Sequence, residues 1–221
     1  MKRIVFWGAS GHAKVLRELV EHLGYELVAT FDNNGEVPAP FADVPLYYGT
    51  QGFERWKQEN GSAKTAGLVA IGGASGRIRL DIQRFMEQNQ VELIKVIHPT
   101  AFVAADAIIR KGSQILVNAS VCPEVTVGEA CILNTASSVD HESVLGNGVH
   151  IAPGAVLAGC VTVGDHTLIG PGAVVVPRVN IGSDVIVGAG SVVTKDVPNG
   201  KVAYGNPARI KGDNLNFRAV Q

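Results

Sequence analysis

Valine, isoleucine and leucine recur at every sixth position along the second half of the chain. The run extends from Val103 to Val193 without an insertion and holds sixteen such residues, since (193 − 103)/6 + 1 = 16. A period of six differs from both the helical period of about 3.6 and the alternation of an ordinary strand. It is typical of a parallel β-helix of hexapeptides, in which each short strand stacks on its neighbours to bury its apolar side chain. The sixteen positions are Val103, Ile109, Ile115, Val121, Val127, Leu133, Val139, Leu145, Ile151, Leu157, Val163, Ile169, Val175, Ile181, Val187 and Val193.

Glycines recur within the six-residue repeat. We expect them at the corners of the column, where a special φ or a close approach of two backbones favours a residue without a side chain. The glycines in question are Gly128, Gly146, Gly164, Gly170, Gly182 and Gly188.

The first 95 residues follow other periods. Apolar runs predict strands over 2–7, 26–31, 66–71 and 91–97. Helical spacing predicts a helix from the Gly8–His12 turn to Gly24, a second over 49–59, and a third after Gly76. The chain therefore reads as a small α/β domain with a mostly parallel, Rossmann-like sheet over 1–95. A β-helix domain with a C-terminal tail follows over 96–221.

The turn after the first strand is rich in glycine and opens a helix. Such a turn presents backbone N–H groups and the positive end of the helix dipole to an anion. The dinucleotide fingerprint G-x-G-x-x-G is not met, because Ser10 stands at the second glycine and Lys14 lies near the third. A nucleotide phosphate without nicotinamide fits better.

In parallel α/β sheets a ligand binds at the carboxyl ends of the strands, which here are near Gly11, Asp32 and Gly72. We expect His12 near the phosphate or sugar and Asp32 toward the ribose or base. Capping of a turn is an equal alternative for Asp32.

The helix after Gly76 carries two arginines in its first turn. Arg77 is a candidate to face the phosphate, whereas we expect Arg79 to be a solvated helix residue. The core-facing residues of this helix are predicted to be Ile78, Ile82, Phe85 and Met86.

The six-residue repeat resembles the left-handed β-helix of the hexapeptide acyltransferases. The resemblance implies that three hexads, 3 × 6 = 18 residues, make one triangular coil and that three columns form a trimer. It also gives the handedness, which spacing alone does not.

Of the six histidines, His141 has the most informative surroundings. Because Val139 is one of the inward-facing residues of the six-residue repeat, the sequence Asp140-His141-Glu142 that follows it is predicted to form an outward turn, where polar groups stay hydrated. With eighteen residues per coil, position 141 + 18 = 159 stacks on His141, and that position is Gly159. We expect this glycine to leave a pocket and an exposed N–H group for a thioester carbonyl. A solvated polar corner is the alternative.

His150 lies nine residues, half a coil, beyond His141. Within one column the two side chains point from different sides, so we expect them to meet only across a subunit boundary. His150 would then order the thioester or pantetheine of the neighbouring subunit's site.

Several segments together resemble bacterial sugar acetyltransferases of the sialic acid O-acetyltransferase type. That group includes N-acetyltransferases of nucleotide-linked 4-amino-4,6-dideoxysugars, such as the bacillosamine-pathway and perosamine enzymes. The departures are Ser10, where a glycine is common, and Gly72-Gly73-Ala74, where polar residues are frequent. The matching segments are Gly8–Val15, Ala70–Gly72, Val96–Pro99, Asn134–Glu142 and Gly205–Ala208.

This resemblance implies acetyl-CoA as co-substrate, a nucleotide-sugar acceptor and a homotrimer with active sites between subunits. It places Asn134 and Glu142 with His141 in the catalytic group, and Gly205 and Pro207 beside the coenzyme A adenine. We expect His141 to be the general base in direct transfer to a 4-amino group, because unperturbed imidazole titrates near pH 6.5. O-acetylation of sialic acid or another sugar hydroxyl is the alternative.

Composition and residue spacing exclude several other classes of function. A formal charge of −1 gives no electrostatic case for nucleic acid or an anionic membrane. The apolar run at the N-terminus is too short for a signal peptide or a span, and three cysteines without disulfide or metal spacing favour the cytoplasm. A γ-class carbonic anhydrase needs two zinc-binding histidines a few residues apart, which are lacking, so no metal is expected. A purely structural column would need no α/β domain.

Overall fold

The structure, a computed structural model, describes residues 1–61 and 64–215. It forms two compact units. One comprises Met1–Gly72 and Asp81–Val96, and the other comprises Gly73–Leu80 and the chain from Ile97 onward. No helix within the described ranges is long and apolar enough to cross a membrane.

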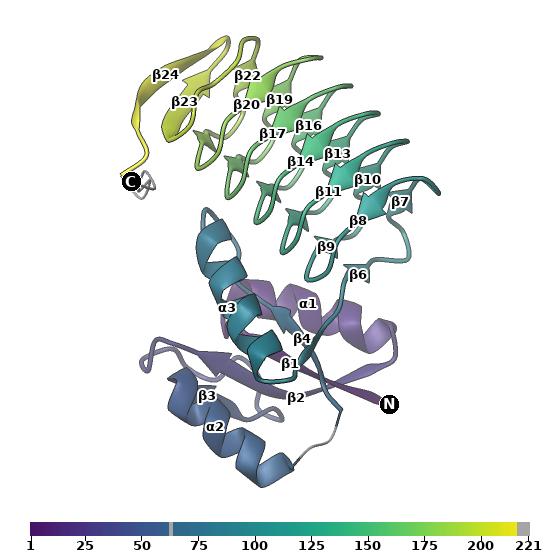
Figure 1. The fold of residues 1–221 in the computed structure, drawn as a ribbon, viewed down its shortest axis with the longest axis vertical. Coiled ribbons are helices and arrows are strands. Elements are labelled where there is room, and N and C mark those ends of the chain that lie inside the picture. The colour runs from purple at the N-terminus through teal and green to yellow at the C-terminus, as the bar shows by residue number, and fades with distance from the viewer. Residues whose placement is uncertain (62–63, 216–221) are drawn as a thin grey trace. The chain divides into compact units, whose positions relative to one another are not determined.

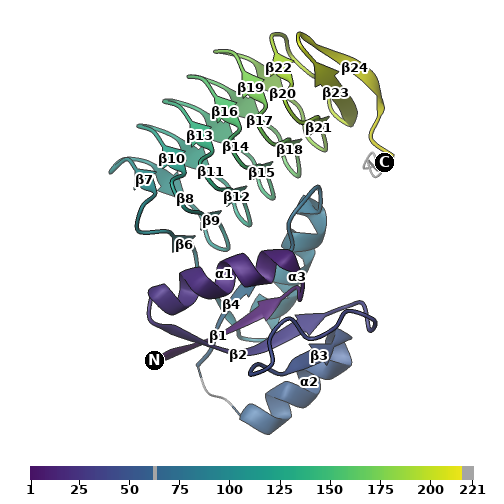
Figure 2. The same ribbon diagram turned by 180° about the vertical axis from the view of Figure 1, so that it is seen from behind.

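The first unit is built on a five-stranded sheet in the order β3-β2-β1-β4-β5, with every neighbouring pair parallel. The predicted α/β domain is confirmed, and Figures 1 and 2 show its helices against the sheet. Its elements are β1 Lys2–Trp7, α1 Gly11–His22, β2 Tyr25–Asp32, β3 Leu46–Tyr48, α2 Gly49–Asn60, β4 Ala66–Val69, β5 Glu92–Leu93 and, from Asp81 onward, α3 Gly76–Gln88.

Alternating residues of β1 build the core on both faces of this sheet. Val5 and Trp7 join Phe53 of α2 and Met86 of α3 in one apolar cluster, so both helices cover the same face. The ring of Trp7 lies 5.4 Å from that of Phe31 and 5.8 Å from that of Phe53. These contacts hold the strand ends that carry the glycine-rich turn.

The second unit is a column of two-residue strands in three parallel sheets (Figure 1). Each predicted apolar position is the second residue of a strand, and Val121 pairs with Val139, one coil of 139 − 121 = 18 residues away. This is the topology of the left-handed β-helix that the resemblance implied. The strands are β6 Val96–Ile97, β7 Phe102–Val103, β8 Ile108–Ile109, β9 Gln114–Ile115, β10 Ser120–Val121, β11 Thr126–Val127, β12 Ile132–Leu133, β13 Ser138–Val139, β14 Val144–Leu145, β15 His150–Ile151, β16 Val156–Leu157, β17 Thr162–Val163, β18 Leu168–Ile169, β19 Val174–Val175, β20 Asn180–Ile181, β21 Ile186–Val187 and β22 Val192–Val193.

A hairpin ends the column. β23 (Lys201–Gly205) pairs in parallel with β21 and antiparallel with β24 (Ala208–Asp213). The tail, which has no hexad period, thus still continues one sheet of the column.

The corner glycines serve close approach rather than a special φ. A Cβ on Gly188 would lie 2.7 Å from the Cβ of Tyr204, and one on Gly170 would lie 2.6 Å from the carbonyl oxygen of Val187. The left-handed backbone positions are elsewhere. One ladder of them, spaced by a coil, consists of Glu124, Glu142, Cys160 and Arg178, with φ between 57° and 63°.

Two expectations for the first 97 residues are corrected. The predicted strand over 91–97 is two strands in different sheets, since β5 pairs with β4 whereas β6 joins β9. Ile78 is 52% exposed, whereas Ile82 and Met86 are buried. Ile78 lies in the Gly73–Leu80 segment, which is grouped with the column and not with the sheet core.

Candidate active site

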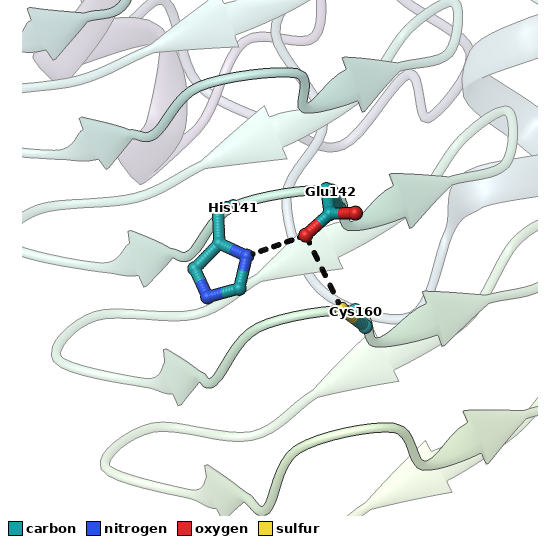
Figure 3. A group of neighbouring side chains, drawn as sticks. All are labelled: His141, Glu142 and Cys160. Atoms are coloured by element: carbon teal, nitrogen blue, oxygen red, sulfur yellow. Dashed lines mark hydrogen bonds and ion pairs between the residues drawn. The ribbon is translucent and has the colours of Figure 1, made fainter.

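His141 stands on an outward corner between β13 and β14, with its side chain half exposed. Its backbone N–H donates to Oδ1 of Asp140 at 2.8 Å, and its Nδ1 lies 2.9 Å from Oε2 of Glu142 (Figure 3). Of the two carboxylates beside His141 in the sequence, Glu142 is the one whose side chain contacts the ring.

The contact between His141 and Glu142 selects the tautomer of the imidazole that can accept a proton at Nε2. The hydrogen bond with His141 is the main reason why the pKa of Glu142 lies below its ordinary value. Glu142 is therefore an anion near neutral pH, and an anionic carboxylate only accepts hydrogen bonds. Nδ1 then carries the hydrogen of the neutral ring, and Nε2 presents its lone pair.

Gly159 stacks on His141 as the eighteen-residue coil predicts. A Cβ on Gly159 would lie 2.5 Å from both Cε1 and Nε2 of the imidazole. The space expected to be an open pocket is thus filled by the ring itself. The absence of a side chain at Gly159 lets the imidazole lie against the next coil. The role of the Gly159 N–H group toward a carbonyl stays a prediction.

Cys160 is the neighbour that the sequence reasoning missed. Its thiol donates to Oε2 of Glu142 at 3.6 Å, and this contact also lowers the pKa of that carboxyl (Figure 3). The eighteen-residue coil could have predicted this contact. Position 142 + 18 = 160 stacks on Glu142, just as position 141 + 18 = 159 stacks on His141.

Asn134 and His150 form a second pair. The amide nitrogen of Asn134 lies 3.2 Å from Nε2 of His150, whose Nδ1 lies 3.2 Å from the carbonyl oxygen of Gly73. His150 is only 6% exposed. Within the described residues, Asn134 makes no hydrogen bond to His141. The catalytic role of Asn134 and the cofactor role of His150 stay predictions.

The Gly73–Leu80 segment is anchored to the column by two arginines. Arg77 contacts both carboxylate oxygens of Asp184 at 3.0 and 3.1 Å, and its role toward a phosphate stays a prediction. Arg79, expected to be solvated, is fully buried, and it donates to the carbonyl oxygens of Ala130 and Gly148 at 3.0 and 2.6 Å. Burial lowers the pKa of Arg79 to about 10. The expectation was wrong because these partners lie 51 and 69 residues away in the sequence.

In the first unit the glycine-rich turn is held by Asp32. Its carboxylate accepts the backbone N–H groups of Ala9 and Asn34, both at 2.9 Å. This is the turn-capping alternative, and a ribose or base contact stays a prediction. A Cβ on Gly72 would lie 3.9 Å from the side chain of His12, so these two candidates are neighbours.

A cavity of about 220 Å³ opens beside this turn. The loop 37–40 forms one wall, and Ala9, Ser10, Gly11 and Lys14 form the other. The α1 helix begins at Gly11, so its N-terminal amides and the Lys14 ammonium lie at a site suited to an anion.

A second cavity, of about 280 Å³, lies where the column meets its terminal hairpin. Lys195 and Arg209 supply two positive charges there against the one negative charge of Asp196, and Val193, Ala203 and Ala208 supply apolar surface. Gly205 is the last residue of β23, and Pro207 lies in the turn of the same hairpin. This cavity offers both apolar surface and cations for a phosphorylated ligand.

The chain is similar to known proteins over both of its units. Residues 3–83 match the PglD N-terminal domain, and residues 142–177 and 160–195 match the bacterial transferase hexapeptide, six repeats. Among solved structures, it is similar to the H141N variant of perosamine N-acetyltransferase from Caulobacter crescentus in complex with CoA and GDP-perosamine. The identity is 32%, over 96% of this chain and 98% of that one, with a TM-score of 0.87.

Two further structures show the same likeness. The acetyltransferase domain of PglB from Neisseria gonorrhoeae in complex with acetyl coenzyme A is 31% identical over 95% of this chain and 99% of that one, with a TM-score of 0.83. WeeI from Acinetobacter baumannii is 28% identical over 96% of this chain and all of that one, with a TM-score of 0.79.

Proposed function

The chain belongs to the bacterial hexapeptide-repeat acetyltransferases that carry a PglD N-terminal domain, and from this we propose that it acetylates a nucleotide-linked amino sugar. Acetyl-CoA is the acetyl donor, and the acceptor is the 4-amino group of a 4-amino-4,6-dideoxysugar. The observation that carries the proposal is the His141–Glu142 pair, which leaves Nε2 of an exposed imidazole free to accept a proton.

The acceptor assignment is supported by the first unit. Its cavity at the start of α1 combines backbone amides with Lys14, which suits the diphosphate of a nucleotide sugar. The similar Caulobacter crescentus enzyme was solved with GDP-perosamine bound. His12 and Gly72, side by side next to this turn, are our candidates for contacts with the sugar.

The donor assignment is supported by the end of the column. Lys195 and Arg209 suit the phosphates of CoA, and the apolar wall suits its adenine, beside Gly205 and Pro207. The similar proteins from Caulobacter crescentus and Neisseria gonorrhoeae were solved with CoA and acetyl-CoA, respectively.

The chemistry is a direct transfer. The amine nitrogen attacks the thioester carbonyl carbon while Nε2 of His141 takes its proton, and negative charge develops on the carbonyl oxygen. The N–H of Gly159 is the candidate donor to that oxygen. The C–S bond then breaks, the CoA thiolate takes the proton from the imidazolium, and an amide and free CoA leave. Glu142 stabilises the imidazolium between the two steps.

We propose a homotrimer of columns as the active form, located in the cytoplasm. Apolar side chains are exposed on two sheets of the column: Phe102, Val156 and Val174 on one, and Ile108 and Val144 on the other. Contact between columns would remove them from water. The three cysteines are free, as a reducing compartment requires. Light scattering tests the assembly, and a stable, fully active monomer would rule it out.

An acceptor panel tests the function. CoA release from acetyl-CoA would be measured with GDP- and UDP-linked 4-amino-4,6-dideoxysugars, with the matching 4-hydroxy sugars, and with free sialic acid. We expect turnover with an amino sugar and none with its hydroxyl counterpart. Replacing His12 with Ala should raise the acceptor KM and leave the acetyl-CoA KM unchanged. Turnover with the hydroxyl acceptors alone would establish O-acetylation instead.

A further inference from the structure

We propose that His141, Glu142 and Cys160 form a binding site for a thiophilic divalent cation, Zn²⁺ above all, and that the bound cation switches the enzyme off. The three residues offer a ring nitrogen, a carboxylate oxygen and a sulfur that all lie within 4.8 Å of one another (Figure 3). Nitrogen, oxygen and sulfur from these three side-chain types are the donors that zinc takes in proteins.

Two of the donor separations lie close to those around a tetrahedral ion. Zinc bonds of ordinary length, at tetrahedral angles, separate sulfur from oxygen by about 3.6 Å and nitrogen from oxygen by about 3.4 Å. In the structure, Sγ of Cys160 lies 3.6 Å from Oε2 of Glu142, and Nδ1 of His141 lies 2.9 Å from that oxygen. The nitrogen and oxygen would separate by about half an ångström to admit the ion. Side-chain rotation alone supplies such a change.

The backbone that carries these donors is hydrogen-bonded to neighbouring coils of the column. Glu142 and Cys160 occupy the same left-handed corner of successive coils, with φ of 57° and 61°. Their N–H groups donate to the carbonyl oxygens of Pro123 at 3.0 Å and His141 at 2.8 Å. The side chains of His141 and Glu142 are about half exposed, which leaves a fourth position open to water. An ion can therefore enter without refolding of the corner.

Occupation of the site and general-base catalysis exclude each other. A metal on Nδ1 uses the lone pair of that nitrogen, so the single proton of the neutral ring resides on Nε2. Nε2 then has no lone pair with which to accept the proton of the amine. The thiol proton of Cys160 leaves to solvent as the sulfur binds, so binding releases one proton. This consequence for activity rests on the proposed role of His141, whereas binding of the ion does not.

Cobalt titration of the full-length protein tests binding independently of activity. Co²⁺ bound to a cysteine thiolate gives a sulfur-to-metal charge-transfer absorption in the near ultraviolet. We expect one equivalent to produce this band, Zn²⁺ to abolish it, and Cys160→Ser to lack it. Cys122→Ser is the matched control, because Cys122 is also half-buried beside a carboxylate, that of Asp140, and should keep the band. An unchanged band in Cys160→Ser, or none in the wild type, would overturn the site.

Acetyl transfer with and without Zn²⁺ tests the switch. Saturating Zn²⁺ should lower kcat of the wild type by about 10²-fold or more, the usual contribution of a general base, and a chelator should restore it. For each variant the rate with zinc is compared with its own metal-free rate, and Cys160→Ser should lose most of the inhibition whereas Cys122→Ser should keep it. Cobalt binding without inhibition, or equal inhibition of Cys160→Ser, would overturn the switch. No transfer by the metal-free wild type would count against the proposed function, and the cobalt spectrum would still decide the site.

Discussion

Replacing Gly159 with alanine is expected to disable His141 without unfolding the column. The added Cβ would lie 2.5 Å from Cε1 and Nε2 of the imidazole and 3.1 Å from Cδ2. Non-bonded carbon atoms settle at about 3.5 Å or more, so the ring must move by about 1 Å. Its bond to Glu142 is the contact that this movement breaks.

The expected magnitude follows from that displacement. A misplacement of about 1 Å at a reacting group can cost about 10²-fold in rate. Stability should hardly change, because the half-exposed ring can swing toward solvent. The φ of Gly159 also lies outside the left-handed region. Where alanine fits the backbone, replacing glycine typically adds about 0.4–1 kcal/mol through the unfolded state.

The assay is kcat and both KM values for acetyl transfer to the best acceptor of the panel, beside the thermal midpoint. We expect kcat to fall about 10²-fold with the midpoint unchanged or higher. Gly212→Ala is the matched control, since a Cβ there meets nothing within 4 Å and its φ is also outside the left-handed region. Wild-type kcat in Gly159→Ala would refute the placement of the ring over Gly159 in the working enzyme.

Three further results are expected. Arg79→Met should lower the free energy of unfolding by about 2–6 kcal/mol, because two buried carbonyl oxygens lose their donor at about 1–3 kcal/mol each. Arg84→Met, on the exposed side of α3, should leave it nearly unchanged. Equal chemical-denaturation midpoints for the two variants would contradict this. The hydrogen bond from Arg17 lowers the pKa of Asp43 to about 2, so the stabilisation is complete above the ordinary value of 3.8 and disappears as the pH falls toward 2. Asp43→Asn should therefore flatten stability against pH in that acid window, and an unchanged slope would argue against the pair. Burial raises the pKa of the Cys131 thiol to about 11, so a thiol reagent should label Cys131 only after unfolding, and its rapid labelling in the folded protein would disagree with that burial.

The spacing of apolar residues was enough to predict most of the fold and part of the candidate site. The six-residue spacing located every strand from β7 to β22, because each inward residue must bury against its counterparts one coil away. The same stacking put Gly159 on His141, and it would have put Cys160 on Glu142 had it been applied there. Local repeats predict what lies one coil above or below a residue.

The remaining features depend on contacts that no local pattern encodes. Arg79 is buried because the Gly73–Leu80 segment packs on corners of the column that follow much later in the chain. His150 hydrogen-bonds a carbonyl oxygen 77 residues away, so its burial could not be inferred from its place in the hexad. Corner glycines were identified, but the sequence does not distinguish a close approach from a left-handed φ.

The most direct test of the account is the turnover of His141→Asn with acetyl-CoA and the nucleotide-linked amino sugar at pH 7. Asparagine keeps a polar side chain on the corner but cannot accept the proton of the amine. If His141 is the general base, kcat falls by about 10²–10⁴-fold while both KM values and the assembly stay as in the wild type. A variant that retains wild-type kcat would remove His141 from the mechanism and with it the proposed direct transfer at this corner.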